Sequence, residues 1–166
     1  EWLVATEQGD IRCEHVVNAG GTYARQMGEW SGLQLPMTSM THHYFVTDTV
    51  PEFQDYDDLP VIRDDRLVSG YIRMEQKSGL IGIYEKENPN AVWVDHCPWD
   101  AENELFAPDY DRIMPWLENA LDRMPIFAEL GIKREVHGAI SHPPDGNPLI
   151  GPAPGVTNYW CCCGTQ

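Results

Sequence analysis

The chain has 166 residues, 42% of them hydrophobic, which is enough to bury a core. Its formal net charge of -15, spread over scattered acidic residues, is typical of a solvated acidic surface and argues against nucleic acid or an anionic membrane as a partner, because both bind through Lys and Arg. No apolar run approaches the roughly 18 residues that a membrane-spanning helix requires.

The first part of the chain predicts a hairpin and then a short helix. Strands at residues 3–6 and 11–17 flank the turn Gln8-Gly9-Asp10. Residues 22–30 predict a helix, with Tyr23, Met27 and Trp30 on one stripe and Gly32 at its end. Between the hairpin and the helix lie Ala19, Gly20 and Gly21, which form either a tight turn or a segment whose main chain approaches a bound ligand closely.

The middle of the chain is rich in strand patterns. A strand is expected at residues 40–47, an acidic loop at 50–59, and a second hairpin at 71–75 and 80–84 around Lys77-Ser78-Gly79. A further loop opens at Asn88 and runs to about residue 108.

A second helix and three strands are expected in the last third. Apolar residues at three- and four-residue steps predict a helix over 109–124, in which Pro115 fits only near the first turn or as a kink. Strands follow at 135–141, 149–152 and 159–163, with a turn at 145–148. The order of elements indicates a mixed α/β or α+β fold.

Two adjacent histidines are the first candidates for chemistry, because histidine can act as a base at neutral pH. Strand alternation places His42 with Tyr44 on one face and His43 with Phe45 on the other. One histidine can therefore line a pocket while the other is solvated or packed, and two purely structural histidines remain an equal alternative.

A second polar pattern lies on the predicted strand 71–75, where Tyr71, Arg73 and Glu75 share a face. The three side chains suit either a polar site or a surface strand with an ion pair. An Arg at a pocket wall is a natural partner for a substrate carboxylate, since its guanidinium binds both oxygens.

No metal site is expected. His137 and His142 lack both the i, i+4 helical spacing and the neighbouring Cys-x-x-Cys pair that are typical of a zinc site. The adjacent cysteines Cys161–Cys163 point to opposite faces of a strand, so they cannot easily bind one metal together. Five cysteines, three of them consecutive, are also not typical of a disulfide framework, so we expect a reducing compartment. The absence of an initiator Met and the strand-like ends favour an interior piece of a longer protein.

Taken in order, four segments resemble a known family. They are Val16-Val17-Asn18-Ala19-Gly20, His42-His43-Tyr44-Phe45-Val46-Thr47, Tyr71-Ile72-Arg73-Met74-Glu75 running to Glu85, and Pro144-Asp145-Gly146-Asn147-Pro148-Leu149-Ile150-Gly151-Pro152 running to Trp160. The pattern resembles the FAD-dependent amine oxidoreductases of the D-amino-acid oxidase superfamily, and within it the dimethylglycine and sarcosine dehydrogenase branch.

The resemblance implies a Rossmann-like FAD-binding domain interrupted by a substrate domain built on a mixed sheet. Residues 1–35 and 139–166 would belong to the FAD-binding domain and residues 36–138 to the substrate domain. It also implies roles for individual residues: His42 and Tyr71 as catalytic residues, Arg73, Tyr44 and the reserve choice His43 as substrate-binding residues, and Ala19, Gly20, Gly21, Asp145, Gly146, Pro148 and Gly151 as FAD-binding residues.

The implied reaction is flavin-dependent oxidation of the N-methyl group of a small secondary or tertiary amino acid such as dimethylglycine or sarcosine. Alternatives are a D-amino-acid or glycine oxidase-like enzyme of the same fold, or a non-enzymatic acidic interaction domain. An electron acceptor or folate is expected to bind through regions outside this chain. The expected location is the cytoplasm, or the mitochondrial matrix in a eukaryote.

The chain departs from the family pattern in one respect. It contains no G-x-G-x-x-G strand-turn-helix, and the glycine-rich segment expected after Gly164 is cut off at Gln166. We therefore expect this piece alone to bind FAD poorly or not at all.

Overall fold

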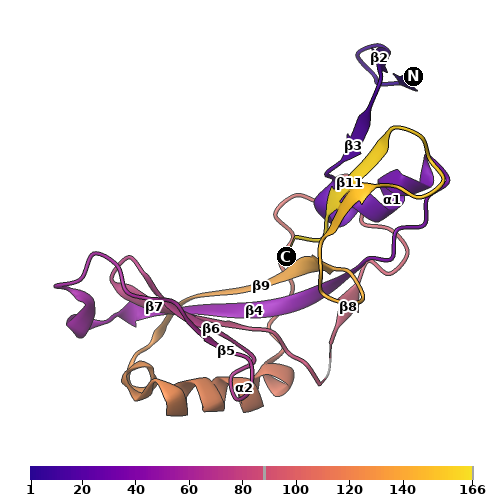
Figure 1. Ribbon diagram of the computed structural model, residues 1–166. Helices are drawn as coiled ribbons and strands as arrows, with labels where there is room; N and C mark the ends of the chain where they lie inside the picture. Colours follow the sequence, from indigo (N-terminus) through magenta and orange to yellow (C-terminus); the bar gives the residue numbers. More distant parts are fainter. Residues whose placement is uncertain (88, 166) are drawn as a thin grey trace. The chain divides into compact units, whose positions relative to one another are not determined.

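The computed structural model describes residues 1–87 and 89–165 (Figure 1). The described residues divide into two compact units, one made of residues 1–40, 91–102 and 140–166, and the other of 41–90 and 103–139. The mixed α/β class predicted from the sequence is confirmed. The assignment of the chain to a flavin-binding and a substrate-binding domain stays a prediction. Asn88 and Gln166, which two of the predictions include, lie outside the described residues.

The first unit is built around a small mixed sheet. Its strands follow the order β10 (Leu149–Pro152), β11 (Tyr159–Cys163) and β3 (Val16–Asn18), with β10 antiparallel and β3 parallel to β11. A 3-10 turn η1 (Gly21–Tyr23) and helix α1 (Ala24–Glu29) follow β3. Ala24, Leu33, Leu35, Met37, Tyr159 and Cys161 are among the residues that form its core.

The N-terminal hairpin prediction was partly wrong. Strands β1 (Trp2–Val4) and β2 (Ile11–Cys13) do pair, but the second strand ends at Cys13. Residues 16–18 form the separate strand β3, because the Val16 amide donates to Asn158 and the strand then pairs with β11.

Helix α1 is shorter than the predicted span of 22–30, and its buried residues are Ala24, Gln26 and Gly28. The stripe of Tyr23, Met27 and Trp30 does not define the buried face, since Trp30 is 73% exposed. Gly32 ends the segment as expected, with φ of +73°.

The second unit is a sheet covered on one face by a helix. The strands run in the order β5 (Ile62–Asp64), β6 (Gly70–Glu75), β7 (Ser78–Ile83) and β4 (Thr38–Thr49), and β9 (Ile132–His142) also pairs with β4. Residues 38–40 of β4 and 140–142 of β9 belong to the first unit, where β8 (Ala91–Val92) pairs with Ser39 and Met40.

Helix α2 (Tyr110–Arg123) lies along one face of this sheet (Figure 1). The Asp109 side chain accepts a hydrogen bond from the Arg112 amide and so caps the helix. Pro115 lies inside the helix, past its first turn, where its ring removes one backbone hydrogen bond. The helix packs Ile113 and Ala120 against sheet residues that include Phe45, Ile72 and Ile81.

Short 3-10 turns complete the unit. Turn η2 (Pro51–Phe53) lies in the segment predicted as an acidic loop, and η3 (Pro125–Glu129) follows α2. Both turns bring a Phe into the core, and Phe53 and Phe127 contact each other edge to face with ring centroids 6.2 Å apart. Of the helices in residues 1–87 and 89–165, none is long and apolar enough to cross a membrane.

Replacing Phe45 with Ala is expected to lower the free energy of unfolding by about 3–5 kcal/mol, because the ring is almost fully buried between the sheet and α2. Chemical denaturation of the parent protein, meaning the longer protein of which this chain is expected to be a piece, measures this loss. Val61→Ala is the control, since an exposed side chain contributes at most about 0.5 kcal/mol. Equal denaturation midpoints for the two variants would contradict the assigned core.

Candidate functional site

A row of polar and aromatic side chains crosses the sheet of the second unit on the face opposite α2. The strand register aligns Tyr44 on β4 with Gly82 on β7, and Gly82 with Tyr71 on β6. Arg63 on β5 continues the row beside Tyr71. Since aligned residues of neighbouring strands share a face, the sheet brings the predicted residues Tyr44 and Tyr71 to the two sides of one glycine.

Tyr84 links the two residues predicted to be catalytic. Its ring lies 5.1 Å from that of His42, edge to face, and 6.0 Å from that of Tyr71. The guanidinium of Arg63 lies 4.9 Å from the centre of the Tyr84 ring. His42, Tyr71 and Tyr84 therefore form one continuous cluster on this face.

The environment of Tyr71 keeps its phenol protonated. Burial raises the pKa of Tyr71, and the neighbouring phenols of Tyr84 and Tyr44 raise it further. The guanidinium groups of Arg73 and Arg63 act in the opposite direction but do not reverse the shift. At neutral pH the Tyr71 hydroxyl is thus a hydrogen-bond donor.

Arg73 forms an ion pair with Glu75 on the same face of β6. The two side chains approach to 2.6 Å and are 38% and 30% exposed. The pair matches the surface-strand alternative considered for this segment. A substrate carboxylate at Arg73 would share the guanidinium with Glu75.

Glu85 is a buried carboxylate that joins both histidines. Its Oε2 lies 2.6 Å from His42 Nδ1 and its Oε1 lies 2.7 Å from His43 Nδ1, and its side chain has no exposed surface. Burial alone would raise the pKa of Glu85, but the hydrogen bonds from His42 and His43 outweigh it and lower the pKa to about 2. Because an ionised carboxylate only accepts, each histidine holds its proton on Nδ1.

The second nitrogen of His43 is also engaged. Its Nε2 accepts a hydrogen bond of 3.1 Å from the backbone amide of Asp109, at the start of α2. With Nδ1 donating to Glu85 and Nε2 accepting, His43 is neutral and its tautomer is fixed. The imidazole of His43 therefore connects Glu85, two residues after β7, to the cap of α2.

Arg112 and His137 extend this buried network. Arg112 Nη2 donates to Thr41 Oγ1 at 2.9 Å and to His137 Nε2 at 3.0 Å, and lies 3.6 Å from Glu85 Oε1. His137 Nδ1 donates to the Ala107 carbonyl at 2.6 Å, and its ring stacks on His43 with centroids 3.7 Å apart. Burial lowers the pKa of His137, and the nearby guanidinium of Arg112 lowers it further, which agrees with a neutral ring that accepts from a guanidinium.

The predicted FAD-binding residues all lie in the first unit. Ala19 and Gly20 follow the carboxyl end of β3, and the turn 145–148 precedes β10. Since Leu149 pairs with Cys163 at the carboxyl end of β11, and β11 runs parallel to β3, both segments lie at the same edge of the sheet. The carboxyl edge of parallel strands is where open α/β sheets bind ligands.

The glycines at this edge of the sheet are required for different structural reasons. A Cβ on Gly20 would lie 2.5 Å from Met27 Sδ and 3.2 Å from the Ala24 amide, so Gly20 serves the packing of α1. Gly21 and Gly151 have φ of +54° and +144°, and in the part of the chain that the structure describes no heavy atom beyond the neighbouring residues lies within 4 Å of an added Cβ. Their backbone is open, so these residues fit the close approach of a dinucleotide.

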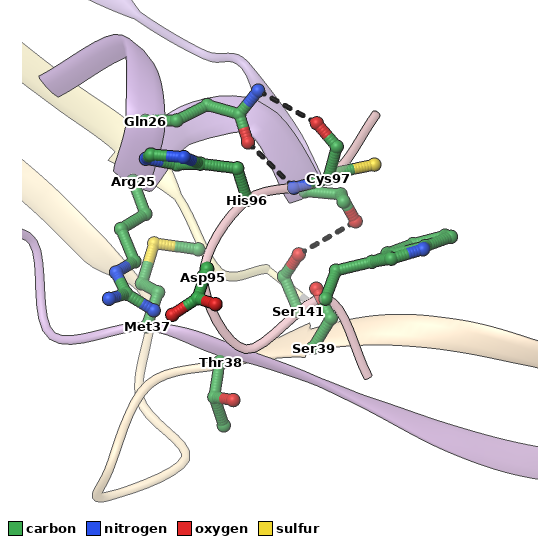
Figure 2. Close-up of a pocket in the computed structure, with 11 residues that line it drawn as sticks. Arg25, Gln26, Met37, Thr38, Ser39, Asp95, His96, Cys97 and Ser141 are labelled. Carbon is green, nitrogen blue, oxygen red and sulfur yellow. Dashed lines mark hydrogen bonds between the residues drawn. The ribbon is translucent and has the colours of Figure 1, made fainter. Parts of the chain in front are cut away.

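Two cavities in the first unit differ in what they can hold. Gly151 lines one of about 470 Å³ with residues 33–36, 149, 150, 152–154 and 161, mostly apolar, a size suited to part of a cofactor. The pocket in Figure 2, lined by Arg25, Gln26, Asp95 and Cys97 among others, has only about 20 Å³, room for a water-sized molecule. Gln26 closes it by pairing its amide with the backbone N–H and carbonyl of Cys97 at 2.8 and 3.0 Å.

The turn at 145–148 is held by its own side chain. The Asn147 amide donates to Asp145 Oδ1 at 3.0 Å, and this bond lowers the pKa of Asp145. Gly146 has φ of +71°, while Pro148 leads into β10. Within residues 1–87 and 89–165, no group of three or more His, Cys, Asp or Glu side chains is arranged to hold a metal ion.

Tyr84, Glu85 and Arg112 belong to this cluster and its buried network but were not identified as site residues from the sequence. Tyr84 could have been found, since alternation from Gly82 places it on the face of Tyr71. Glu85 and Arg112 carry no such signal, because charged residues at a strand end and in the first turns of a helix are ordinarily exposed.

Comparison with known proteins identifies the family. The family model described as DAO, FAD dependent oxidoreductase, matches residues 1–166. The chain therefore belongs to the DAO family of FAD-dependent oxidoreductases, and the resemblance noted in its motifs is confirmed.

Similar curated proteins are several times longer. The chain is 40% identical over 168 residues to the mitochondrial dimethylglycine dehydrogenase of Mus musculus, which covers 98% of this chain and 19% of that protein. It is 32% identical over 161 residues to the mitochondrial sarcosine dehydrogenase of Mus musculus, covering 97% and 17%. It is also 30% identical over 170 residues to the mitochondrial pyruvate dehydrogenase phosphatase regulatory subunit of Mus musculus, covering 97% and 18%. The chain spans about a fifth of the length of these relatives.

Solved structures agree on the fold. The L-proline dehydrogenase of P. horikoshii superposes with a TM-score of 0.74 at 20% identity, over 98% of this chain and 40% of that chain. The glycine oxidase of Geobacillus kaustophilus gives 0.65 at 18% identity, over 98% and 39%.

Replacing Glu85 with Gln is expected to lower the free energy of unfolding by about 1–3 kcal/mol, because the new amide N–H would face a histidine N–H. The substitution should also change the pH dependence. A carboxyl whose folded pKa is depressed stabilises the fold above its ordinary value of 4.5 and loses this effect as the pH falls toward about 2. Denaturation at several pH values between these limits should give a flatter slope for E85Q than for the unsubstituted protein. Identical slopes would contradict the assigned bonds.

Proposed function

We propose that the parent protein oxidises the N-methyl group of a small secondary or tertiary amino acid such as dimethylglycine or sarcosine, using FAD. The observation that carries the proposal is the cluster of His42, Tyr71 and Tyr84 on one sheet face of a family member. The 40% identity to a dimethylglycine dehydrogenase supports this choice of substrate class.

In this proposal the first unit supplies the FAD contacts. Residues 1–35 form the later part of the FAD-binding domain, and at residues 139–166 the chain returns to that domain. Ala19, Gly21, Asp145, Gly146, Pro148 and Gly151 would hold FAD at the sheet edge, and Gly20 would support them by packing α1. When bound, FAD supplies an acceptor for the hydride that leaves the carbon attached to the amine nitrogen.

His42 is the proposed base. Its Nδ1 donates to Glu85, so Nε2 is the nitrogen that can take a proton from the substrate amine. Glu85 acts through His42 by fixing its tautomer and orientation. The fixed hydrogen bonds of His43 favour a structural role for that residue. His43 is kept as a substrate-binding residue only as the alternative to His42.

Tyr71 and Tyr44 would orient the amine from the two sides of Gly82, and the protonated Tyr71 hydroxyl would donate a hydrogen bond to it. Arg73 would bind the substrate carboxylate, in competition with Glu75. Residues 36–138 form the substrate domain in this proposal.

Folate or an electron acceptor would bind outside this chain, and the mitochondrial matrix is the proposed location in a eukaryote. A second candidate is a non-catalytic role for the parent protein. It is favoured by the 30% identity to a regulatory subunit, which shows that similar sequences occur in a protein named for regulation.

The proposal is tested by the visible spectrum of the purified full-length parent protein, before and after dimethylglycine or sarcosine is added without oxygen. Flavin bands that bleach are the expected result, because electrons from the amine reduce the flavin. Bands that persist with both amines would reject these substrates, and a parent protein that takes up no FAD would favour the non-catalytic candidate.

His42→Ala in the full-length parent protein is expected to lower kcat by about 10²-fold to 10⁴-fold, the range for loss of a general base. Flavin content should stay near that of the unsubstituted protein, because His42 lies in the second unit. Steady-state kinetics and flavin absorbance measure the two effects, and His96→Ala, an exposed histidine paired with Glu29, is the control. Unchanged turnover in H42A would remove His42 from the mechanism.

A further inference from the structure

Gly82 occupies the centre of the polar sheet face. Tyr44 and Tyr71 flank it on the neighbouring strands, and Tyr84 follows two residues later, just after the end of β7. Three large aromatic residues thus surround a position that has no side chain.

The Tyr71 ring lies directly on Gly82. A Cβ built on Gly82 would be 2.3 Å from Tyr71 Cζ, 2.4 Å from Cε1 and 2.6 Å from the hydroxyl oxygen. Contacts this short do not occur between real atoms, so any side chain at position 82 must displace the phenol. The three nearest atoms all belong to Tyr71, and the displacement therefore falls on that side chain and not on the backbone.

Backbone conformation does not explain the glycine. Gly82 is absent from the glycines with positive φ, so its conformation is one that any residue adopts. Glycine inside a strand also costs roughly 0.5–1 kcal/mol relative to alanine. The remaining reason for a glycine here is space, and Tyr71 takes that space.

A second glycine of the same strand, Gly79, makes room for a different ring on the other face of the sheet. A Cβ on Gly79 would meet the Phe127 ring at 2.5 Å, and Phe127 belongs to the core beneath the sheet. Gly79 thus accommodates a core ring on one face, whereas Gly82 accommodates a polar ring on the other.

We propose that Gly82 is a positioning residue that holds the Tyr71 hydroxyl over β7, between Tyr44 and Tyr84, where it meets the amine substrate. The proposal rests on the function proposed above. It implies that a substitution at position 82 moves Tyr71 without removing its hydroxyl, so activity falls although every proposed catalytic group is present.

The test uses the full-length parent protein and four variants: G82A, Y71A, the double variant, and the control G138A. Gly138 is a strand glycine of the same unit, and a Cβ there would lie 3.8 Å from Leu105 Cδ2, an ordinary contact. Kinetics with dimethylglycine and sarcosine give kcat and KM, and thermal unfolding gives Tm for each variant.

G82A should lower kcat/KM by about 10²-fold, as expected for a misplacement of about 1 Å. G138A should stay within about twofold of the unsubstituted protein. In the Y71A background the G82A substitution should change kcat/KM by no more than about twofold, because the ring that it displaces is gone. G82A should also lower Tm in the otherwise unsubstituted protein, and this decrease should likewise disappear in the Y71A background.

The proposal would be overturned if G82A and Y71A acted independently, so that their effects multiplied in kcat/KM and added in Tm. It would also be overturned if G82A were as active as G138A. Failure of the proposed function gives a different result. In that case the unsubstituted protein oxidises neither amine, and the Tm values of the four variants alone decide whether Gly82 seats Tyr71.

Discussion

The buried carboxylate of Glu85 organises the second unit. It accepts the Nδ1 protons of His42 and His43, which lie on opposite faces of β4, and so connects the polar face of the sheet to the network beneath it. Without these two bonds burial would favour the protonated acid, since a buried carboxylate is costly unless it is paired and hydrogen-bonded. Arg112 Nη2, 3.6 Å from Glu85 Oε1, adds a positive charge beside the carboxylate.

The two histidines that are hydrogen-bonded to Glu85 have different roles. His43 is neutral and hydrogen-bonded through both nitrogens, to Glu85 and to the Asp109 amide at the start of α2, so it stabilises the junction of sheet and helix. His42 faces Tyr84 and, through it, Tyr71, so it belongs to the cluster proposed to handle the amine. The same carboxylate thus serves the fold through one histidine and the proposed chemistry through the other, which is the reason we place Glu85 behind His42 as the group that orients it.

Much of the fold followed from local patterns, and most of the site contacts did not. Alternation predicted β4, β6, β7 and the shared face of Tyr71 and Arg73, because a strand exposes alternate residues whatever it pairs with. The spacing of Ile113, Leu117 and Leu121 predicted α2 for a similar reason. The separation of β3 from the first hairpin depends on pairing with β11, more than 140 residues away, and the contact of Glu85 with two histidines depends on the register of β4 against β7. Such long-range pairings leave no local periodicity in a single sequence.

The positions of the histidine protons test the central claim most directly. Neutron diffraction from crystals of the full-length parent protein at neutral pH would locate them. We predict a proton on Nδ1 of both His42 and His43, directed at an ionised Glu85, and no proton on Nε2 of His43. A protonated Glu85, or a His43 that carries its proton on Nε2, would contradict this account.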